Sequence, residues 1–375
     1  MSLVVDSRID NRYSNGFISA SYASSFDDTN KLIQCNICVR RCIIGLGKHG
    51  HCGRRVNRDG MLYADNYGMI ISHMVDPIEK KPLYHFEPGT HTFSIAAAGC
   101  NLSCDHCQNW MISQLHLHSY SNLPLNSQSN SYSRHNHEIS RREQFTLPDH
   151  VVAHAQAEQC SSISFTYTEP TIWFEYVRDI GKLAHVHGLS TVMVTNGTIT
   201  NEALAELIPF LDAYRVDIKA FSDTFYRNIC HSPAGTLDQV LSSCKQAYDA
   251  GLHVEIVNLL IPGKNDAPDE ITKLCDWIVS ELSERVPVHF TRYHPQYQMQ
   301  IPATPIHNLE RAYLIAREHD ILYPYIGNVP GHTYEHTYCP ECETMVIKRD
   351  RFLSDVPDVL LIDGCCQACG YQVFP

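Results

Sequence analysis

The stretch Ala98-Gly-Cys-Asn-Leu-Ser-Cys-Asp-His-Cys-Gln-Asn-Trp110 carries the most information in this chain. It places cysteines at positions 100, 104 and 107, a C-x3-C-x2-C spacing. Three thiolates this close together can hold three irons of a four-iron, four-sulfur (4Fe-4S) cluster. The fourth iron then has no protein ligand, and an open iron is a place where a cofactor or a substrate can bind and react.

A structural zinc site is the alternative interpretation of the same residues. Zinc prefers a closed set of four ligands, usually from paired C-x2-C elements. Here the number of cysteines is odd, and His106, directly before Cys107, is a poor candidate for the fourth ligand. The spacing and its context therefore favour the iron–sulfur cluster.

The motif follows an apolar segment, residues 92–96, and in this context it resembles the cysteine motif of the radical S-adenosylmethionine (radical SAM) superfamily. In that superfamily the amino and carboxyl groups of SAM chelate the open iron. The cluster donates one electron, SAM is cleaved, and a 5′-deoxyadenosyl radical abstracts a hydrogen atom. The resemblance implies a 4Fe-4S cluster and SAM as cofactors of an enzyme whose substrate is unidentified.

The composition limits the class of protein. The formal net charge of −12 argues against nucleic-acid binding, which needs a basic face. The chain has no apolar run of about 18 residues, so we expect no membrane span. Residues 1–30 lack the apolar stretch of a signal peptide. The 16 cysteines are therefore expected to be reduced and to bind metal in a cytoplasmic protein.

From residue 92 onward, β-rich runs alternate with helical patterns. The expected strands cover residues 92–98, 162–168, 190–195, 213–219, 253–260, 287–293 and 321–327. The expected helices lie near residues 149–159, 171–187, 200–210, 236–250, 267–282 and 305–319. Six or seven βα units in series predict an α/β fold with a parallel sheet or barrel. The cysteine motif then falls at the carboxyl ends of the strands, where the active residues of such barrels lie.

Four segments are expected along the chain. Residues 1–30 are polar and predict a disordered tail, and residues 31–90 form a cysteine-rich module. The barrel covers residues 91–329, and residues 330–375 form a zinc-ribbon-like module. Residues 115–147 predict a mobile insertion in the barrel. Its histidines could bind metal, but a solvated loop is the preferred interpretation; they are His116, His118, His135 and His137.

The second expected strand ends in Phe165-Thr-Tyr-Thr-Glu-Pro170, in the place of the Gly-Gly-Glu segment of radical SAM proteins. That segment hydrogen-bonds the amino group of SAM, and a carboxylate suits an ammonium group. Glu169, with Thr168 beside it, is therefore a candidate SAM ligand, although Tyr167 and Thr168 replace the glycines. The alternative is a glutamate that begins a helix, where the helix dipole favours a negative charge.

The next two strands also carry polar residues near their ends. Asn196 follows the third strand, and Asp217 and Lys219 interrupt an apolar run in the fourth. Buried charges need a partner. We expect Asn196 to contact SAM, and the two charged residues either to contact SAM or the substrate, or to form a salt bridge that is only structural.

Two further sets of cysteines predict metal sites. The first set is interleaved with glycines, which let the loop fold round a metal, and either zinc or a second cluster fits it: Cys35, Cys38, Cys42 and Cys52. The second set forms two C-x2-C pairs and predicts a structural zinc, with rubredoxin-like iron as the alternative: Cys339, Cys342, Cys366 and Cys369. Cys365 is left over.

The whole arrangement resembles the radical SAM protein of the AmmeMemoRadiSam system, a relative of pyruvate formate-lyase activating enzymes. The resemblance runs from about residue 31 to the end and rests on residues 35–42, 51–55, 76–86, 99–110 and 327–329. It implies a partial (β/α)6-type barrel and a SAM-bound cluster. It also implies partner proteins of the Memo and AMMECR types.

Three functions are compatible with these patterns. The first is an enzyme that cleaves SAM with an electron from a donor such as ferredoxin or flavodoxin, and abstracts hydrogen from its substrate. The second is an activase that installs a glycyl radical on a partner protein. The third is an iron–sulfur and zinc scaffold or electron carrier without enzymatic activity. The cysteine triad argues against the third, because an electron carrier needs no open iron.

Overall fold

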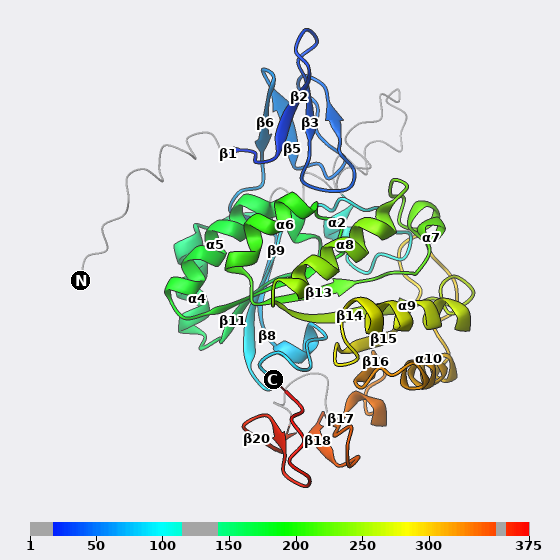
Figure 1. Ribbon diagram of the computed structural model, residues 1–375. Helices are drawn as coiled ribbons and strands as arrows, with labels where there is room; N and C mark the ends of the chain where they lie inside the picture. The colour runs from blue at the N-terminus through cyan, green and yellow to red at the C-terminus, as the bar shows by residue number, and fades with distance from the viewer. Residues whose placement is uncertain (1–17, 115–141, 350–357, 375) are drawn as a thin grey trace, which may run out of the picture.

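The computed structural model describes residues 18–114, 142–349 and 358–374. Seven parallel strands form most of its central sheet: β9 (His91–Ala96), β11 (Ser162–Phe165), β12 (Ser190–Thr195), β13 (Ala213–Asp217), β14 (His253–Leu260), β15 (Val288–Arg292) and β16 (Pro324–Gly327). An eighth strand, β8 (Ser72–Pro77), pairs antiparallel with β9. The order across the sheet is β16-β15-β14-β13-β12-β11-β9-β8 (Figure 1). This sequential order is the one in which a βα series builds a barrel wall.

Helices connect the strands and cover the sheet (Figure 1). The longer ones are α4 (Pro148–Ala157), α5 (Phe174–Val186), α6 (Asn201–Leu207), α7 (Asp223–Asn228), α8 (Thr236–Asp249), α9 (Pro268–Glu281) and α10 (Ile306–Glu318). The short ones are η1 (Ile78–Lys80), α2 (Trp110–Ser113), η3 (Pro170–Trp173), η4 (Ile208–Phe210) and η5 (Thr333–Glu335). Within the described ranges, no helix combines the length and the apolar character needed to cross a membrane.

The expected strands and helices agree with these elements to within a few residues. Prolines mark the starts of α4, η3 and α9, where the missing amide hydrogen costs no helical hydrogen bond. In α5, the buried residues Phe174, Val177, Ile180 and Ala184 recur every three or four positions. Two elements were not expected, β8 and α7. The polar residues of β8 hide its strand pattern, and α7 has only six residues.

The N-terminal module is built from short antiparallel strands: β1 (Ile18–Ser19), β2 (Ala23–Asp27), β3 (Leu32–Cys35), β4 (Ile43–Ile44), β5 (Arg55–Arg58), β6 (Met61–Ala64) and β7 (Met69–Ile70). The expectation of a disordered tail up to residue 30 is wrong for residues 18–30. There β1 pairs with β6 and β2 pairs with β3, and the ring of Tyr22 packs edge-on against Phe174. Residues 1–17 lie outside the described ranges.

The end of the predicted mobile insertion is part of the fold. Strand β10 (Gln144–Phe145) pairs with β7, and Glu143 forms an ion pair with Arg54 of the N-terminal module. The expectation is therefore wrong for residues 142–147, because this segment adds a strand to a neighbouring edge. Residues 115–141 lie outside the described ranges, with the histidines His116, His118, His135 and His137.

The C-terminal module lies at the opposite end of the molecule from the N-terminal module (Figure 1). Its strands are β17 (Thr337–Tyr338), β18 (Met345–Lys348), β19 (Asp358–Val359), β20 (Leu361–Ile362) and β21 (Cys365–Cys366). Arg349 attaches it to the segment after β8, with its guanidinium 3.9 Å from the ring centre of Tyr84 and a 2.9 Å hydrogen bond to that residue's carbonyl. Arg285 donates to the Tyr371 hydroxyl at 2.8 Å. These contacts hold the C-terminal module against the barrel.

Candidate functional site

The cysteine triad lies in the loop between β9 and α2. Cys100 and Cys104 are buried, and Cys107 is partly exposed. The loop is held by backbone hydrogen bonds from Ser103 to the carbonyl of Cys230 (3.1 Å) and from Asp105 to that of Ile229 (2.9 Å). These bonds fix the loop against the segment that follows α7.

Several groups are placed to stabilise thiolates in the triad. The amide of Leu102 donates to Cys100 Sγ at 3.4 Å, and Asn196 Nδ2 lies 3.9 Å from the same sulfur. Ser113 Oγ lies 3.1 Å from Cys107 Sγ. A hydrogen bond from Cys230 lowers the pKa of Cys104, and the nearby ammonium of Lys219 acts in the same direction. Burial raises the pKa of Cys100 and Cys107, so the groups named here act against that effect. Such surroundings suit thiolate ligands of iron.

The spacing of the triad fits a cluster better than zinc. Tetrahedral zinc, with Zn–S bonds of about 2.3 Å, holds its sulfurs about 3.8 Å apart. Among the described residues, the triad and His106 do not bring three ligand atoms within 4.8 Å of one another. A 4Fe-4S cluster inserts irons and sulfides between the thiolates and so separates them more widely. The three cysteines therefore fit three irons of such a cluster.

A cavity of about 320 Å³ opens beside the triad. The three cysteines line it together with Thr168, Asn196, Asp217 and Lys219, which were expected to bind the cofactor. These residues come from the carboxyl ends of β11, β12 and β13 or directly after them. The structure therefore brings together the triad and four of the five expected cofactor ligands.

Glu169 is the exception, because it does not belong to the described residues that line the cavity. Its Oε1 accepts hydrogen bonds from the amide and hydroxyl of Thr171 (3.0 and 2.6 Å) and from the hydroxyl of Thr195 (2.7 Å). Its Oε2 accepts from the amide of Asn196 at 2.8 Å. Burial raises the pKa of this carboxyl, and these bonds oppose that effect. In this geometry Glu169 begins η3 and ties it to β12.

We expect Glu169→Gln to lower the free energy of unfolding by about 1–3 kcal/mol, because the amide nitrogen of glutamine cannot accept the bonds that one oxygen now accepts. The affinity for SAM should change by less than about twofold, or about 0.4 kcal/mol, because Glu169 is not among the described residues that line the cavity. Chemical denaturation and equilibrium SAM binding measure the two quantities, with the exposed Glu158→Gln as the control. A tenfold loss of SAM affinity at unchanged stability would instead make Glu169 a ligand.

Asp217 is the centre of a charged group on the cavity wall. Its oxygens lie 2.6 Å from Arg215 Nη1 and 3.3 Å from Lys219 Nζ. Burial would raise the pKa of Asp217, but the two cations lower it below its ordinary value. The expected salt bridge is thus present, and it lies on the cavity wall, where its members can also meet a ligand.

The cavity also reaches residues that the sequence did not suggest. Lys81, Tyr167, Arg215 and His289 all line it. Lys81 Nζ lies 2.6 Å from the buried carboxylate of Asp76, which also accepts from the Tyr167 hydroxyl at 2.8 Å. Tyr167 has a φ of 70°, a conformation that favours glycine, as expected where it replaces a glycine of the related motif. The order of the residues does not reveal that the segment after β8 folds back into this cavity.

Burial lowers the pKa of Lys81 from 10.5 to about 8, although Asp76 acts in the opposite direction. Between these two values the unfolded chain binds more protons than the folded one, so this group makes stability rise with pH. We expect the unfolding free energy to rise more steeply between pH 8 and about 10 in the parent protein than in Lys81→Met. Lys80→Met removes the other ammonium group that pairs with Asp76. In this control variant the unfolding free energy should still rise more steeply with pH than in Lys81→Met. Equal slopes for parent and Lys81→Met would contradict this assignment.

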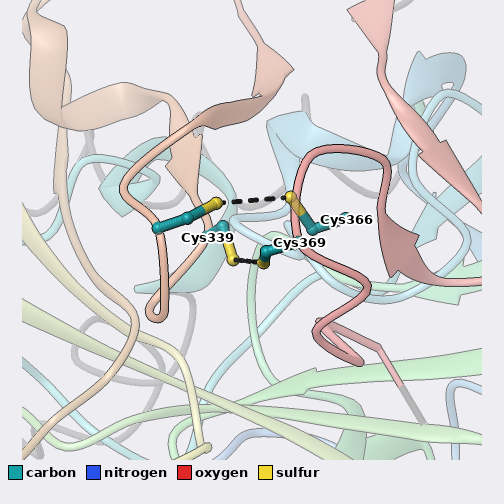
Figure 2. Close-up of side chains that lie close together, drawn as sticks. Cys339, Cys366 and Cys369 are labelled. Atoms are coloured by element: carbon teal, nitrogen blue, oxygen red, sulfur yellow. Dashed lines mark hydrogen bonds between the residues drawn. The ribbon is translucent and has the colours of Figure 1, made fainter.

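The C-terminal cysteines form a compact group (Figure 2). The sulfurs of Cys339 and Cys369 are 3.6 Å apart, and those of Cys342 and Cys366 are 3.6 Å apart. All four lie within 4.8 Å of one another and can hold a metal ion. Cys365 Sγ instead lies 3.1 Å from the side-chain oxygen of Gln372, outside this group.

The N-terminal cysteines lie in the N-terminal module, where the carbonyl of Cys52 packs against Gly99 of the triad loop. Cys35, Cys38 and Cys52 are buried, and Cys42 is partly exposed. The amide of Cys35 donates to the carbonyl of Cys42 at 2.9 Å, which closes the loop between them.

Comparison with known proteins gives matches over the same region. A family model described as the radical SAM superfamily matches residues 94–278, which include the triad. An uncharacterised protein of Methanocaldococcus jannaschii is 41% identical over 347 residues, or 92% of this chain and 96% of that protein.

Two solved structures match this chain at low identity and with TM-scores below 0.5. A radical SAM methyltransferase from Sphaerobacter thermophilus has a TM-score of 0.47 and 12% identity, covering 86% of this chain and 82% of that one. A domain of a pyruvate-formate lyase-activating enzyme from Bacteroides vulgatus has a TM-score of 0.39 and 20% identity, covering 45% of this chain and 99% of that one.

Proposed function

We propose that this chain, which has a radical SAM superfamily domain over residues 94–278, is an enzyme that cleaves SAM reductively and abstracts hydrogen from a substrate held in the central cavity. One observation carries the proposal: the cavity joins three thiolates, spaced for a cluster with an open iron, to polar groups that can bind SAM. When bound, the cluster and SAM supply one electron and the 5′-deoxyadenosyl radical that takes the hydrogen atom.

The polar groups beside the triad match the groups of SAM. The carboxylate of Asp217 suits the ammonium of SAM, and the ammonium of Lys219 suits its carboxylate. Asn196 hydrogen-bonds both Cys100 and Asn101, so it links the loop of the triad to the cavity wall. Thr168 donates its hydroxyl to the carbonyl of Ala97 at 2.6 Å, which fixes the end of β11 against β9. In this proposal these four residues replace Glu169 as the SAM-binding set.

The far part of the cavity favours a substrate with a negatively charged group. Arg215 is buried, and its Nε has no hydrogen-bond acceptor in the part of the chain that the structure describes. Lys81 and His289 line the same space. An anionic group of the substrate would pair with this cationic lining, since guanidinium groups bind carboxylates and phosphates well.

We propose further that the chain acts in an AmmeMemoRadiSam system, with partners of the Memo and AMMECR types and with ferredoxin or flavodoxin as the electron donor. The support is the resemblance of residues 76–86 to the radical SAM protein of that system. Within this segment, Lys81 lines the cavity. A second candidate is an activase that acts on a glycine of a partner protein, as pyruvate formate-lyase activating enzymes do. A scaffold or electron carrier is the least favoured, because neither needs a cavity beside an open iron.

The C-terminal cysteines also suggest a metal and a cellular location. We propose zinc for the C-terminal group, because its 3.6 Å sulfur distances are close to the ~3.8 Å of tetrahedral zinc. We propose a cytoplasmic location, because thiolate metal sites persist where cysteines stay reduced.

Product analysis tests the proposed function. Anaerobic protein with a reconstituted cluster, incubated with SAM and dithionite, should form 5′-deoxyadenosine and methionine in equal amounts. Variants of Asp217 and Lys219 (Asp217→Asn and Lys219→Met) should bind SAM at least about tenfold less tightly, because each removes a charged partner. Parent protein that holds its cluster and binds SAM, yet forms neither product, would overturn the proposal.

A further inference from the structure

The N-terminal cysteine set is in backbone contact with the loop of the triad. A Cβ atom on Gly99, which directly precedes Cys100, would lie 2.8 Å from the carbonyl oxygen of Cys52. Only glycine fits at this distance, and its φ of 100° also favours glycine. The chain therefore brings the N-terminal set as close to Cys100 as backbone packing allows.

A second contact runs through the loop after β12. Cys38 forms an antiparallel bridge with Ile199, and the amide of Val39 donates to the carbonyl of Thr198 at 2.9 Å. The hydroxyl of Thr198 accepts a 2.7 Å hydrogen bond from Asn101, the neighbour of Cys100. One short hydrogen-bonded chain thus joins the two sets of cysteines.

Among the described residues, the N-terminal sulfurs are not gathered as closely as the C-terminal four. In the described parts of the chain, the C-terminal group alone brings three or more potential ligand atoms within 4.8 Å of one another. The N-terminal set lies beyond this limit, as the triad does. Since one and the same structure holds the C-terminal group at zinc spacing, the wider spacing of the other two sets points to a larger inorganic core between the thiolates.

Two arginines lie among these sulfurs. The guanidinium of Arg40, between Cys38 and Cys42 in the chain, donates to the carbonyl of Asn101, the residue after Cys100, and to that of His231. Arg55 is 1% exposed and pairs with Glu175 at 2.7 Å, but its Nε has no acceptor among the described residues. A core of negative charge with sulfide acceptors would satisfy this donor and balance the cations.

We propose that Cys35, Cys38, Cys42 and Cys52 hold a second 4Fe-4S cluster, which passes single electrons to the cluster of the triad. Cys42 is partly exposed, so an external donor can approach the second cluster from solvent. A reduced flavodoxin or ferredoxin loses one electron to the second cluster, which is oxidised again when it reduces the first. The transfer of electrons rests on the proposed function, whereas the presence of the second cluster does not.

Metal analysis of the full-length protein tests the second cluster. After anaerobic reconstitution we expect about eight irons and about one zinc per chain, and two equivalents of electrons in a reductive titration. About four irons with about two zinc ions would overturn the proposal without any variant. The Cys38→Ala/Cys42→Ala double variant, which leaves only two thiolates in the N-terminal set, should lose about four irons and keep the triad cluster. Cys160→Ala, a buried cysteine outside every set, is the control.

A comparison of two reductants, flavodoxin and dithionite, tests the electron transfer between the two clusters. In the Cys38→Ala/Cys42→Ala double variant, the formation of 5′-deoxyadenosine with reduced flavodoxin should fall at least about tenfold, while the rate with dithionite stays within about twofold. An equal loss with both reductants would overturn the transfer role. If the parent protein forms no 5′-deoxyadenosine with dithionite, the proposed function fails, and the iron count still decides whether the second cluster exists.

Discussion

Cys104→Ala should abolish SAM cleavage, with a loss of at least about a hundredfold in 5′-deoxyadenosine formation. Removal of an outer partner of a metal ligand alone costs about 10- to 100-fold, so loss of an iron ligand itself should cost more. Cys104 is buried between the hydrogen bonds of Ser103 and Asp105. Alanine fits in that space, so the fold should remain while the iron is lost. Anaerobic product assays together with iron analysis measure the effect.

Cys275→Ala is the matched control for this variant. Cys275 is equally buried, but it lies on α9, away from the three sets of cysteines. It should keep the iron content and the activity of the parent protein. If Cys104→Ala kept its full iron content and activity, or if Cys275→Ala lost them equally, the triad would not be the site of SAM cleavage.

Cys366→Ala should remove the metal of the C-terminal group and unfold its module. Structural zinc contributes about 10–16 kcal/mol to the folding of small zinc domains, and this module has little core of its own. Its buried cluster is small and includes Cys339 and Cys366 themselves. Hydrogen exchange of the full-length protein should show loss of protection in β17, β18 and β21, while the central sheet stays protected.

Cys365→Ala, one position away, controls for this experiment. The Cys365 sulfur contacts Gln372 and lies outside the group of four. This variant should keep about one zinc per chain and normal protection. Zinc content and protection at the level of the parent protein in Cys366→Ala would contradict a structural metal at this site.

The sequence predicted the sheet and its helices well because their patterns are local. Buried residues recur every three or four positions in α5, and proline marks the starts of α4, η3 and α9. The strands of residues 18–30 were not predicted, because their formation does not depend on a local pattern. Strand β2 is Ala-Ser-Ser-Phe-Asp and mostly exposed, so it has no apolar pattern, and its pairing with β3 depends on the partner strand.

The site was predictable where chemistry follows from residue type and spacing. The triad, Asn196, Asp217 and Lys219 line one cavity, as their positions at strand ends suggested. Glu169 shows the limit of this reasoning. A strand end places a residue near the mouth of a barrel, but its side chain can turn into the cavity or into the wall. Thr171, Thr195 and the amide of Asn196 draw this carboxylate into the wall.

Residues that reach the cavity from a distance were not predictable. Lys81 and Asp76 precede the first parallel strand, and they meet Tyr167 from the next strand across the sheet. Only the antiparallel pairing of β8 with β9 brings them there. Resemblance to a family marked residues 76–86 as specific but gave no reason for that specificity.

Electron paramagnetic resonance of the reduced protein, before and after the addition of SAM, tests the central claim most directly. A cluster with an open iron changes its spectrum when SAM binds, whereas a cluster closed by four cysteines does not. We predict a SAM-dependent change in the parent protein and in the Cys38→Ala/Cys42→Ala double variant, and none in the variant with Cys100, Cys104 and Cys107 all replaced by alanine. A parent spectrum that SAM leaves unchanged, or a SAM-dependent change that persists in the triple variant, would contradict an open iron at the triad.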